Sequence, residues 1–206
     1  MQGIKIILLF IALMLTGSNM IYAQEDTALN SALEKIIQAS LTGNNQEIMR
    51  YTAPRLIKAL GGEESALKLF NETLASRKDN DTTRIDTVIN YNKMDPIQLG
   101  SIYFKFIPQL IVMSIPDKEK KMIAVTNIMA IKEDENSNWK FIDTNNIGDE
   151  ELDIILPEFK DKIKIPRATS EPIIIHKNEV SETVQNLLEI IDEAVKGEAK
   201  KSVSFQ

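Results

Sequence analysis

The stretch that most constrains the fold is residues 98–144, in which three strands are joined by short polar links. The strands are predicted over Gln98–Ser114, Lys120–Glu133 and Asn138–Thr144. β-Branched and aromatic residues crowd the strands, whereas Pro, Asp, Asn and Ser crowd the links, as an antiparallel meander requires. A further strand is predicted over Thr82–Tyr91. Because the preceding chain is helical in pattern, we expect an α+β fold with N-terminal helices packed on an antiparallel sheet.

Both faces of the long predicted strands are apolar. The alternating apolar positions include Ile102, Tyr103, Phe104, Phe106, Ile107, Ile123, Val125 and Ile128. A sheet with one face in water would alternate apolar with polar residues, so we expect a further layer to cover the second face. Pro108 lies in mid-strand and cannot donate a hydrogen bond to a neighbouring strand. It therefore predicts a bulge or a sharp bend, and hence a strongly bent sheet.

Amphipathic helical patterns occupy the chain before the strands. Apolar residues over Asp26–Leu41 recur at the spacing of one helix face. Asn44, followed three residues later by Glu47, is typical of a capping box and predicts the start of a second helix. Pro54 forces a break or a restart because its ring clashes with the preceding turn. A third helix is predicted over Glu63–Leu74.

The C-terminal part contains a stretch with apolar residues spaced for burial and one more helical pattern. Asp149–Ile165 has apolar residues spaced for burial, Pro166–Pro172 indicates a linker, and Ile173–Ile175 is a short apolar run. A final amphipathic helix is predicted over Asn178–Lys196, with Gly197 as its stop. If this helix folds back over the sheet, it provides the layer that the second apolar face requires. If it does not, dimerisation through that face is the expected alternative.

The N-terminus has the layout of a secretory signal peptide. Lys5 supplies a positive charge, Ile6–Leu15 is an unbroken apolar run, and Ala23 offers a small residue at the cleavage site. We therefore expect cleavage after Ala23 and a periplasmic or secreted protein with no membrane association after cleavage. An uncleaved membrane anchor is the alternative. No other stretch is long and apolar enough to span a bilayer.

Composition narrows the classes of function. The chain contains no cysteine, which excludes disulfides, thiolate chemistry and lipid anchoring as a bacterial lipoprotein. A net charge of −6 argues against binding to nucleic acid or to anionic membranes. We divide the chain into a signal peptide (1–23), an α+β domain (24–166), and a linker with a C-terminal amphipathic helix (167–206).

The order of these elements, together with four short motifs, resembles a known superfamily. The motifs are Tyr51-Thr52-Ala53-Pro54, Gly61-Gly62-Glu63, Ile107-Pro108-Gln109 and the run Trp139–Asp143. Over residues 25–165 the chain is similar to the nuclear transport factor 2-like, or cystatin-like, superfamily, in particular its exported members from Bacteroides-type bacteria. The resemblance implies a cone in which helices wrap a curved sheet and leave a cavity at the open end. Members include isomerases, dehydratases, polyketide cyclases, transport adaptors and binding proteins, so the fold does not define the chemistry.

The implied cone gives two sets of expected residues. The core or cavity lining should contain Leu33, Ile37, Phe70, Leu74, Phe106, Val125, Trp139 and Phe141. The residues expected to bind a ligand are Tyr51, Phe70, Tyr103, Phe106 and Trp139. Trp139 has two interpretations, a surface that stacks on a sugar or lipid and a core plug that closes the meander, of which we favour the second.

Few residues are candidates for catalysis. Asp86, Tyr91, Tyr103 and Asp143 lie on or beside predicted strands and could form an Asp base with a Tyr donor. The alternative places Asp86 in solvent, Tyr103 at a sheet edge and Asp143 in a turn. The single histidine, His176, lies outside the predicted cone. We therefore assign no catalytic residues, no metal site and no cofactor.

These observations leave three hypotheses for function. We favour an exported, non-catalytic protein that binds a small apolar ligand or a peptide in the cavity, because such pockets are mostly hydrophobic with a few polar anchors. The second hypothesis is an interaction module that forms a homodimer or docks a partner through the outer sheet face. The third is an enzyme of the isomerase or dehydratase type.

Overall fold

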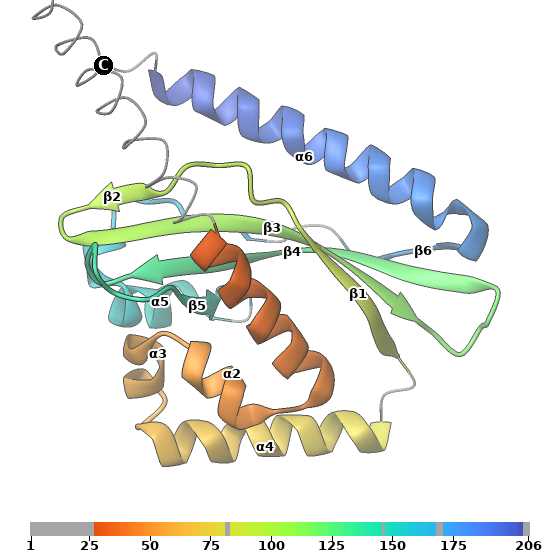
Figure 1. The fold of residues 1–206 in the computed structure, drawn as a ribbon, viewed down its shortest axis with the longest axis horizontal. Coiled ribbons are helices and arrows are strands. Elements are labelled where there is room, and N and C mark those ends of the chain that lie inside the picture. Colours follow the sequence, from red (N-terminus) through yellow and green to blue (C-terminus); the bar gives the residue numbers. More distant parts are fainter. Residues whose placement is uncertain (1–26, 81–82, 146, 168–170, 204–206) are drawn as a thin grey trace, which may run out of the picture.

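The computed structural model describes residues 27–80, 83–145, 147–167 and 171–203, with side chains described up to residue 73 in the first range and up to residue 196 in the last (Figure 1). The predicted signal peptide lies outside the described residues. The fold is α+β, as predicted: helices accompany a six-stranded antiparallel sheet in which the order β1-β3-β4-β5 forms the main path. Strand β2 pairs with β3, and β6 pairs with β4.

The elements follow one another as helices, strands and again helices. The first helix covers residues 27–42. The next helices are α2 (Asn45–Tyr51), α3 (Pro54–Ala59) and α4 (Glu63–Asn80). The strands are β1 (Arg84–Asn90), β2 (Ile97–Leu99), β3 (Ile102–Ser114), β4 (Lys120–Lys132), β5 (Lys140–Asp143) and β6 (Ile173–His176). Helix α5 (Asp149–Ile155) and the short 3-10 helix η1 (Pro157–Phe159) follow β5, and η2 (Lys177–Glu179) leads into α6 (Val180–Val203).

Local sequence signals explain several helix ends. The side chain of Asn44 accepts a hydrogen bond from the Glu47 backbone N–H at 3.2 Å, so the predicted N-cap is confirmed. Pro54 occupies the first turn of α3, where its missing N–H costs nothing, so the predicted restart is confirmed as well. The predicted stop at Gly197 is wrong, because α6 continues to Val203. One glycine weakens a helix by only about 1 kcal/mol, and the surrounding Glu, Ala and Lys residues favour the helix.

One other helix boundary differs from prediction, and a proline explains where the helix after β5 ends. Helix α4 extends to Asn80 rather than ending at Leu74, because residues 75–80 contain no Gly or Pro to stop it. Within Asp149–Ile165, where apolar residues are spaced for burial, α5 ends at Ile155 with Leu156 as its C-cap, and η1 begins at Pro157. A residue preceding proline is disfavoured in the helical conformation, which explains the break.

The long strand predicted over Gln98–Ser114 is a hairpin of β2 and β3. Gly100 adopts a φ of +64°, a left-handed conformation that glycine tolerates without a steric penalty. The turn brings Leu99 opposite Ile102 and Ile97 opposite Phe104. The composition of this stretch predicts extended chain correctly, but it does not indicate the turn that the single glycine makes.

The predicted bulge at Pro108 is also wrong. The β3–β4 register runs without interruption from Tyr103 opposite Lys132 to Ser114 opposite Lys121, with Pro108 opposite Asn127. The Pro108 carbonyl accepts a hydrogen bond from the Tyr91 N–H at 2.8 Å, so the backbone polar groups of Pro108 point towards β1. In an extended strand the N–H and C=O of one residue lie on the same side, and the missing N–H therefore removes no bond to β4.

The bulge lies instead in β1, at Asp86. Ile85 is opposite Met113 and Thr87 is opposite Val112, so Asp86 is the extra residue. An inserted residue reverses the alternation of side chains beyond it. Simple alternation along a strand over Thr82–Tyr91 would place Ile85 on the face of Thr87 and Ile89, but the bulge makes Ile85 share a face with Val88 instead.

Both faces of the sheet carry buried apolar residues, as the alternation predicted. On one face, Ile107 and Ile128 lie directly opposite each other on β3 and β4. They pack in a cluster with residues of the first helix, Trp139 and Phe141. On the other face, the Phe104 ring lies 4.5 Å from the Phe159 ring within a cluster formed with α5 and η1.

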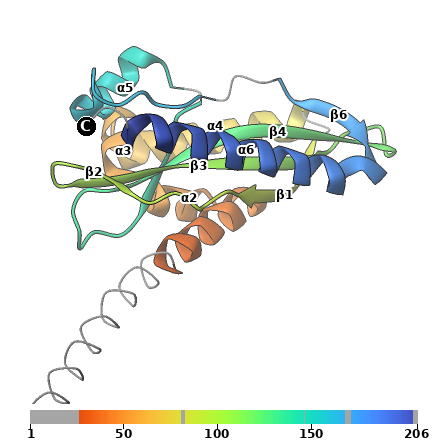
Figure 2. The same cartoon turned by 90° about the horizontal axis from the view of Figure 1, so that it is seen from above.

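The second face continues beneath the C-terminal helix. Leu110, Val112 and Ile123 are all 5% exposed or less. Figures 1 and 2 show α6 running along this side of β3 and β4, opposite the side that carries α2 and α4. Strand β6 pairs with the start of β4, from Lys120 opposite His176 to Ile123 opposite Ile173, and this pairing leads the chain into α6.

Candidate functional site: an apolar cavity between helices and sheet

A cavity of about 320 Å³ lies between the sheet and the helices that cover its first face. Its walls come from the first helix, α2, α3 and α4 on one side and from β1, β3, β4 and β5 on the other. The apolar lining includes Ile36, Ile48, Phe70, Val88, Ile111 and Ile128. Gln109 and Thr126, directly opposite each other on β3 and β4, add polar groups to the same wall.

Most polar groups in the lining already have partners. The hydroxyls of Ser40 and Thr52 each donate to the carbonyl one helical turn earlier, Ile36 and Ile48, at 2.8 and 2.9 Å. The amide of Gln109, which is 8% exposed, donates to Asn90 Oδ1 at 2.7 Å. These bonds leave an inner wall that favours apolar ligand groups.

An exposed carboxylate lies at the edge of the cavity. Asp143 is the last residue of β5 and lines the cavity. The side-chain amide of Asn145 donates to Asp143 Oδ1 and to Thr126 Oγ1, both at 2.6 Å, and so holds the carboxylate beside the sheet. A negative group in this position disfavours an anionic ligand and suits a neutral one that carries a hydrogen-bond donor.

The five residues predicted to bind a ligand do not form one site. Phe70 lines the apolar cavity. Tyr51 and Trp139 line a different hollow, and Trp139 is only 4% exposed, which agrees with the core-plug interpretation. Phe106 packs edge-on against Phe104 at 5.6 Å on the other side of the sheet. Tyr103 is half-buried against the cluster beneath the first helix.

The residues predicted to form the core or line the cavity agree better with the structure. Leu33, Trp139 and Phe141 are buried, Ile37 lines the cavity, and Val125 is half-buried. The side chain of Leu74 lies outside the described residues. The prediction omits four residues that line the cavity, although their alternation with the positions facing α6 indicates one shared sheet face: Gln109, Ile111, Thr126 and Ile128.

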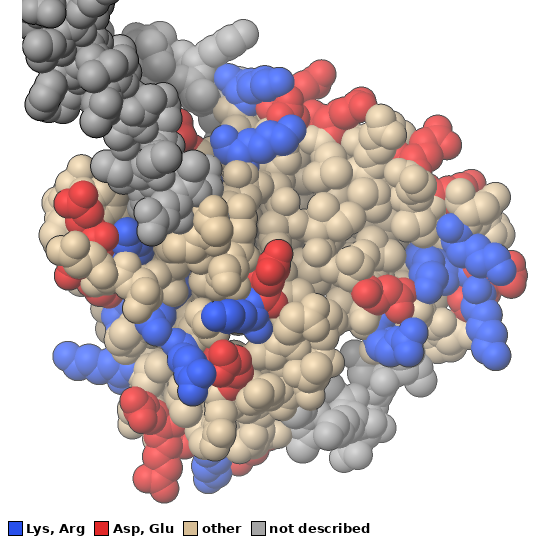
Figure 3. Space-filling model, viewed as in Figure 1, with Lys and Arg blue, Asp and Glu red and all other residues tan. Residues whose placement is uncertain are grey.

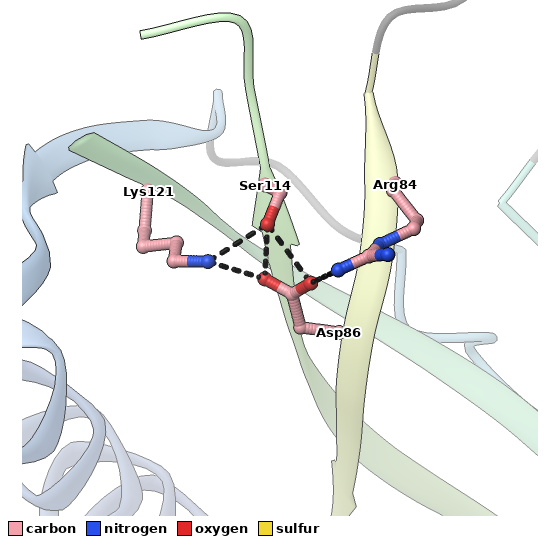
Figure 4. Close-up of polar contacts among 4 residues, drawn as sticks. All are labelled: Arg84, Asp86, Ser114 and Lys121. Atoms are coloured by element: carbon pink, nitrogen blue, oxygen red, sulfur yellow. Dashed lines mark hydrogen bonds and ion pairs between the residues drawn. The ribbon is translucent and has the colours of Figure 1, made fainter. Parts of the chain in front are cut away.

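Asp86 participates in a polar network rather than in the cavity (Figure 4). Its carboxylate accepts hydrogen bonds from the Ser114 hydroxyl at 2.8 and 2.9 Å and from the Lys121 ammonium at 2.8 Å, and it pairs with Arg84 at 3.4 Å. Burial raises the pKa of Asp86, but the bonds from Lys121 and Ser114 outweigh burial, so the pKa lies below its usual range. A carboxyl that is ionised in this way cannot serve as a proton donor at neutral pH, and the network instead fixes the bulge.

Lys121 and Ser114 do not form an activated nucleophile. The Lys121 Nζ lies 2.7 Å from the Ser114 Oγ, a distance at which a neutral lysine could take the hydroxyl proton. However, the Lys121 ammonium also pairs with Asp86, and the Ser114 hydroxyl donates to that same carboxylate. The three groups therefore satisfy one another.

Tyr91 connects the end of the sheet to the C-terminal helix. It is 5% exposed, and its hydroxyl donates a hydrogen bond to Asp192 of α6. This bond to a carboxylate, helped by burial, raises the pKa of Tyr91 to about 12. Bonds from Lys196 and Tyr91 lower the pKa of Asp192 to about 2. Tyr91 is thus committed to positioning α6.

The candidate acid and base residues therefore do not converge. Asp86 lies in the bulge network, Tyr91 contacts α6, Tyr103 contacts the first-helix cluster, and Asp143 lies at the cavity. His176 is exposed at the end of β6, where its backbone N–H donates to Glu179 Oε2 at 3.0 Å. Within the described ranges, no three His, Cys, Asp or Glu side chains are grouped so that they could hold a metal ion.

None of the helices in the described part of the chain combines the length and apolar character needed to cross a membrane. The chain matches no protein-family model, and no curated protein or solved structure matches it.

Proposed function

We propose that this chain is an exported, non-catalytic binding protein that holds a small apolar ligand, or the apolar side chains of a peptide, between its helices and its sheet. The observation that carries the proposal is the cavity of about 320 Å³ with an inner wall of Ile, Val and Phe side chains. Such a volume lies at the lower end of the range for small-molecule sites, so the favoured ligand is compact.

The polarity of the cavity refines the ligand class. Asp143 contributes a carboxylate at the edge, while Gln109 and Thr126 supply neutral polar groups. A neutral ligand with one hydroxyl or amide group would match this arrangement, because its apolar body contacts the isoleucines and its donor reaches the carboxylate.

Export and superfamily membership belong to the same proposal. Residues 1–23 have the pattern of a signal peptide cleaved after Ala23. The nuclear transport factor 2-like cone, with a strongly bent sheet, is supported by the element order and by the position of the cavity between helices and sheet. Cavities in that superfamily lie at the open end of the cone, which is the kind of site proposed for this chain.

The interaction-module hypothesis requires a specific rearrangement. The outer sheet face is the one along which α6 runs (Figure 2), and its residues Leu110, Val112 and Ile123 are buried. A partner or second copy would have to displace α6 from this face. The ligand cavity requires no such displacement, and we therefore favour it.

Native mass spectrometry of protein purified without denaturation tests the proposal directly. We expect a mass above that of the chain which is lost on unfolding. A neutral apolar probe, N-phenyl-1-naphthylamine, provides a second measurement because its fluorescence rises when it leaves water. The variant Ile111→Trp fills the cavity and should abolish the probe signal.

A matched control makes the result interpretable. Ile190 lies on α6 and is 60% exposed, so Ile190→Trp adds the same indole away from the cavity and should leave probe binding unchanged. A bare mass, no probe binding to the wild type, or equal probe binding to Ile111→Trp and wild type would each refute the proposal.

A further inference from the structure

A second hollow, separate from the apolar cavity, carries an excess of positive charge. It encloses about 790 Å³ between the first helix, the end of α2, and the β4–β5 link with its flanking residues. Its basic lining residues are Lys35, Arg50, Lys132 and Lys140, whereas Glu135 is its one acidic lining residue. Figure 3 shows Lys and Arg side chains, with Asp and Glu side chains among them, on the face that carries α2 and the first helix. The chain as a whole has a net charge of −6, so this excess is local.

Two of the four basic side chains lack a carboxylate partner among the described residues. Arg50 pairs with Glu47 at 3.0 Å. Lys140 makes a different contact: its ammonium donates to the Arg50 carbonyl at 2.6 Å and lies 6.0 Å from the centre of the Tyr51 ring. These contacts fix the position of Lys140 without neutralising its charge, and two of its three N–H donors remain available. Lys35, on the first helix, likewise has no ion pair in the described part of the chain.

Aromatic side chains complete the hollow. The ammonium of Lys132, a residue that is 8% exposed, lies 5.3 Å from the centre of the Trp139 ring. This arrangement holds a third positive charge at a site with little access to water. The indole N–H of Trp139 is buried with no hydrogen-bond partner among the described residues. Buried donors are normally satisfied, so this N–H lacks the hydrogen bond that such groups usually make.

We propose that this hollow binds a compact polyanion, whose carboxylate or phosphate groups lie between Lys35 on the first helix and Lys140 on β5. The two lysines come from different walls of the same hollow, and a ligand with at least two negative groups can contact both. Positively charged groups held in place before binding gain affinity because less ordering is required. The apolar cavity, which has Asp143 at its edge, selects against such a ligand, so the two sites differ in chemistry.

Isothermal titration calorimetry with two probes tests this site. Citrate supplies carboxylates and pyrophosphate supplies phosphates, while acetate at the same ionic strength serves as the monovalent control. We expect at least one polyanion to bind more tightly than acetate and to change the fluorescence of Trp139, the chain's single tryptophan. Preference for citrate would identify a carboxylate ligand, and preference for pyrophosphate a phosphate ligand.

Matched variants separate a built site from general charge attraction. Lys35→Gln and Lys140→Gln should each weaken binding about fivefold, as expected for one partly exposed ion pair. Lys118→Gln makes the same charge change on the exposed β3–β4 link and should have little effect. The proposal is overturned if both polyanions bind no better than acetate, or if Lys118→Gln weakens binding as much as Lys35→Gln and Lys140→Gln.

Discussion

Two isoleucines that face each other across the β3–β4 ladder provide a direct test of the apolar cavity. Ile107 and Ile128 are cross-strand partners on the same sheet face. Ile107 is fully buried in the cluster beneath the first helix, whereas Ile128 is half-buried and lines the cavity. Truncation of each to alanine removes the same atoms from the same kind of strand position, so the loss of β propensity is similar in both variants.

The surroundings predict different losses of stability. Removing three carbons from a fully buried side chain forfeits about 2.4 kcal/mol of transfer free energy, at ~0.8 kcal/mol per carbon. Ile107→Ala also leaves a new void, which brings the expected cost to about 4 kcal/mol. Ile128 already borders empty space, so its truncation only enlarges an existing cavity and forfeits roughly half of the transfer term. For Ile128→Ala we expect about 1–2 kcal/mol.

Urea unfolding followed by the fluorescence of Trp139 measures both free energies with one probe, because Trp139 is the only tryptophan and is buried. The slopes of free energy against urea should agree between the two variants, so that the difference in midpoints reports stability. If Ile128→Ala costs as much as Ile107→Ala, the side chain at 128 is tightly packed in solution. That result would refute the existence of the cavity and remove the basis of the proposed function.

Three further predictions concern pH and helix capping. The pKa of Tyr91 is about 12 in the folded protein and 10.0 when free, so its bond to Asp192 should stabilise the fold fully below pH 10 and lose this effect as the pH approaches 12. In urea titrations, the difference in unfolding free energy between wild type and Tyr91→Phe should therefore shrink between pH 10 and pH 12. The pKa of Asp86 is lowered in the folded protein, so the pH dependence is reversed: its network should stabilise the fold above pH 3.8 and weaken as acid protonates the carboxylate. The melting temperatures of wild type and Asp86→Asn should therefore converge at acid pH. Asn44→Ala should cost about 0.5–2 kcal/mol in chemical unfolding, while Asn44→Asp, which keeps the capping oxygen, should cost much less.

The class of fold was predictable because the apolar pattern has a strict period on both strands of the central hairpin. The alternation of Phe104 with Ile107 along β3 required two covered faces, and each residue is buried in a different cluster. Errors arose where one residue decides the path of the chain. Gly100 turns what composition alone predicts as continuous strand, and the orientation of Pro108 makes its missing N–H harmless to β4. Neither the sign of a glycine φ nor the direction of a carbonyl is encoded in hydrophobic periodicity.

The candidate site was less predictable, for a related reason. The sequence predicts aromatic residues as ligand contacts, but Phe106 and Trp139 serve mainly to fill the core. The cavity is lined chiefly by aliphatic residues on the sheet face that the N-terminal helices cover. The extra residue at Asp86 shifts the alternation of β1, so that Val88 and not Thr87 lines the cavity. Because a bulge changes the phase of a strand, the lining of the cavity depends on a local event that alternation cannot indicate.

The C-terminal segment bears on the choice between ligand binding and docking through the outer sheet face. Three kinds of contact hold it: the pairing of β6 with β4, the bond from Tyr91 to Asp192, and a stripe of half-buried side chains on α6 that includes Leu188. A partner on the outer face would have to replace all three, and its observed affinity would be reduced by the free energy needed to release α6. Tyr91→Phe weakens one of these contacts without altering the cavity. If outer-face docking were the function, this substitution should increase dimerisation or partner binding, whereas the cavity proposal predicts unchanged binding of the apolar probe.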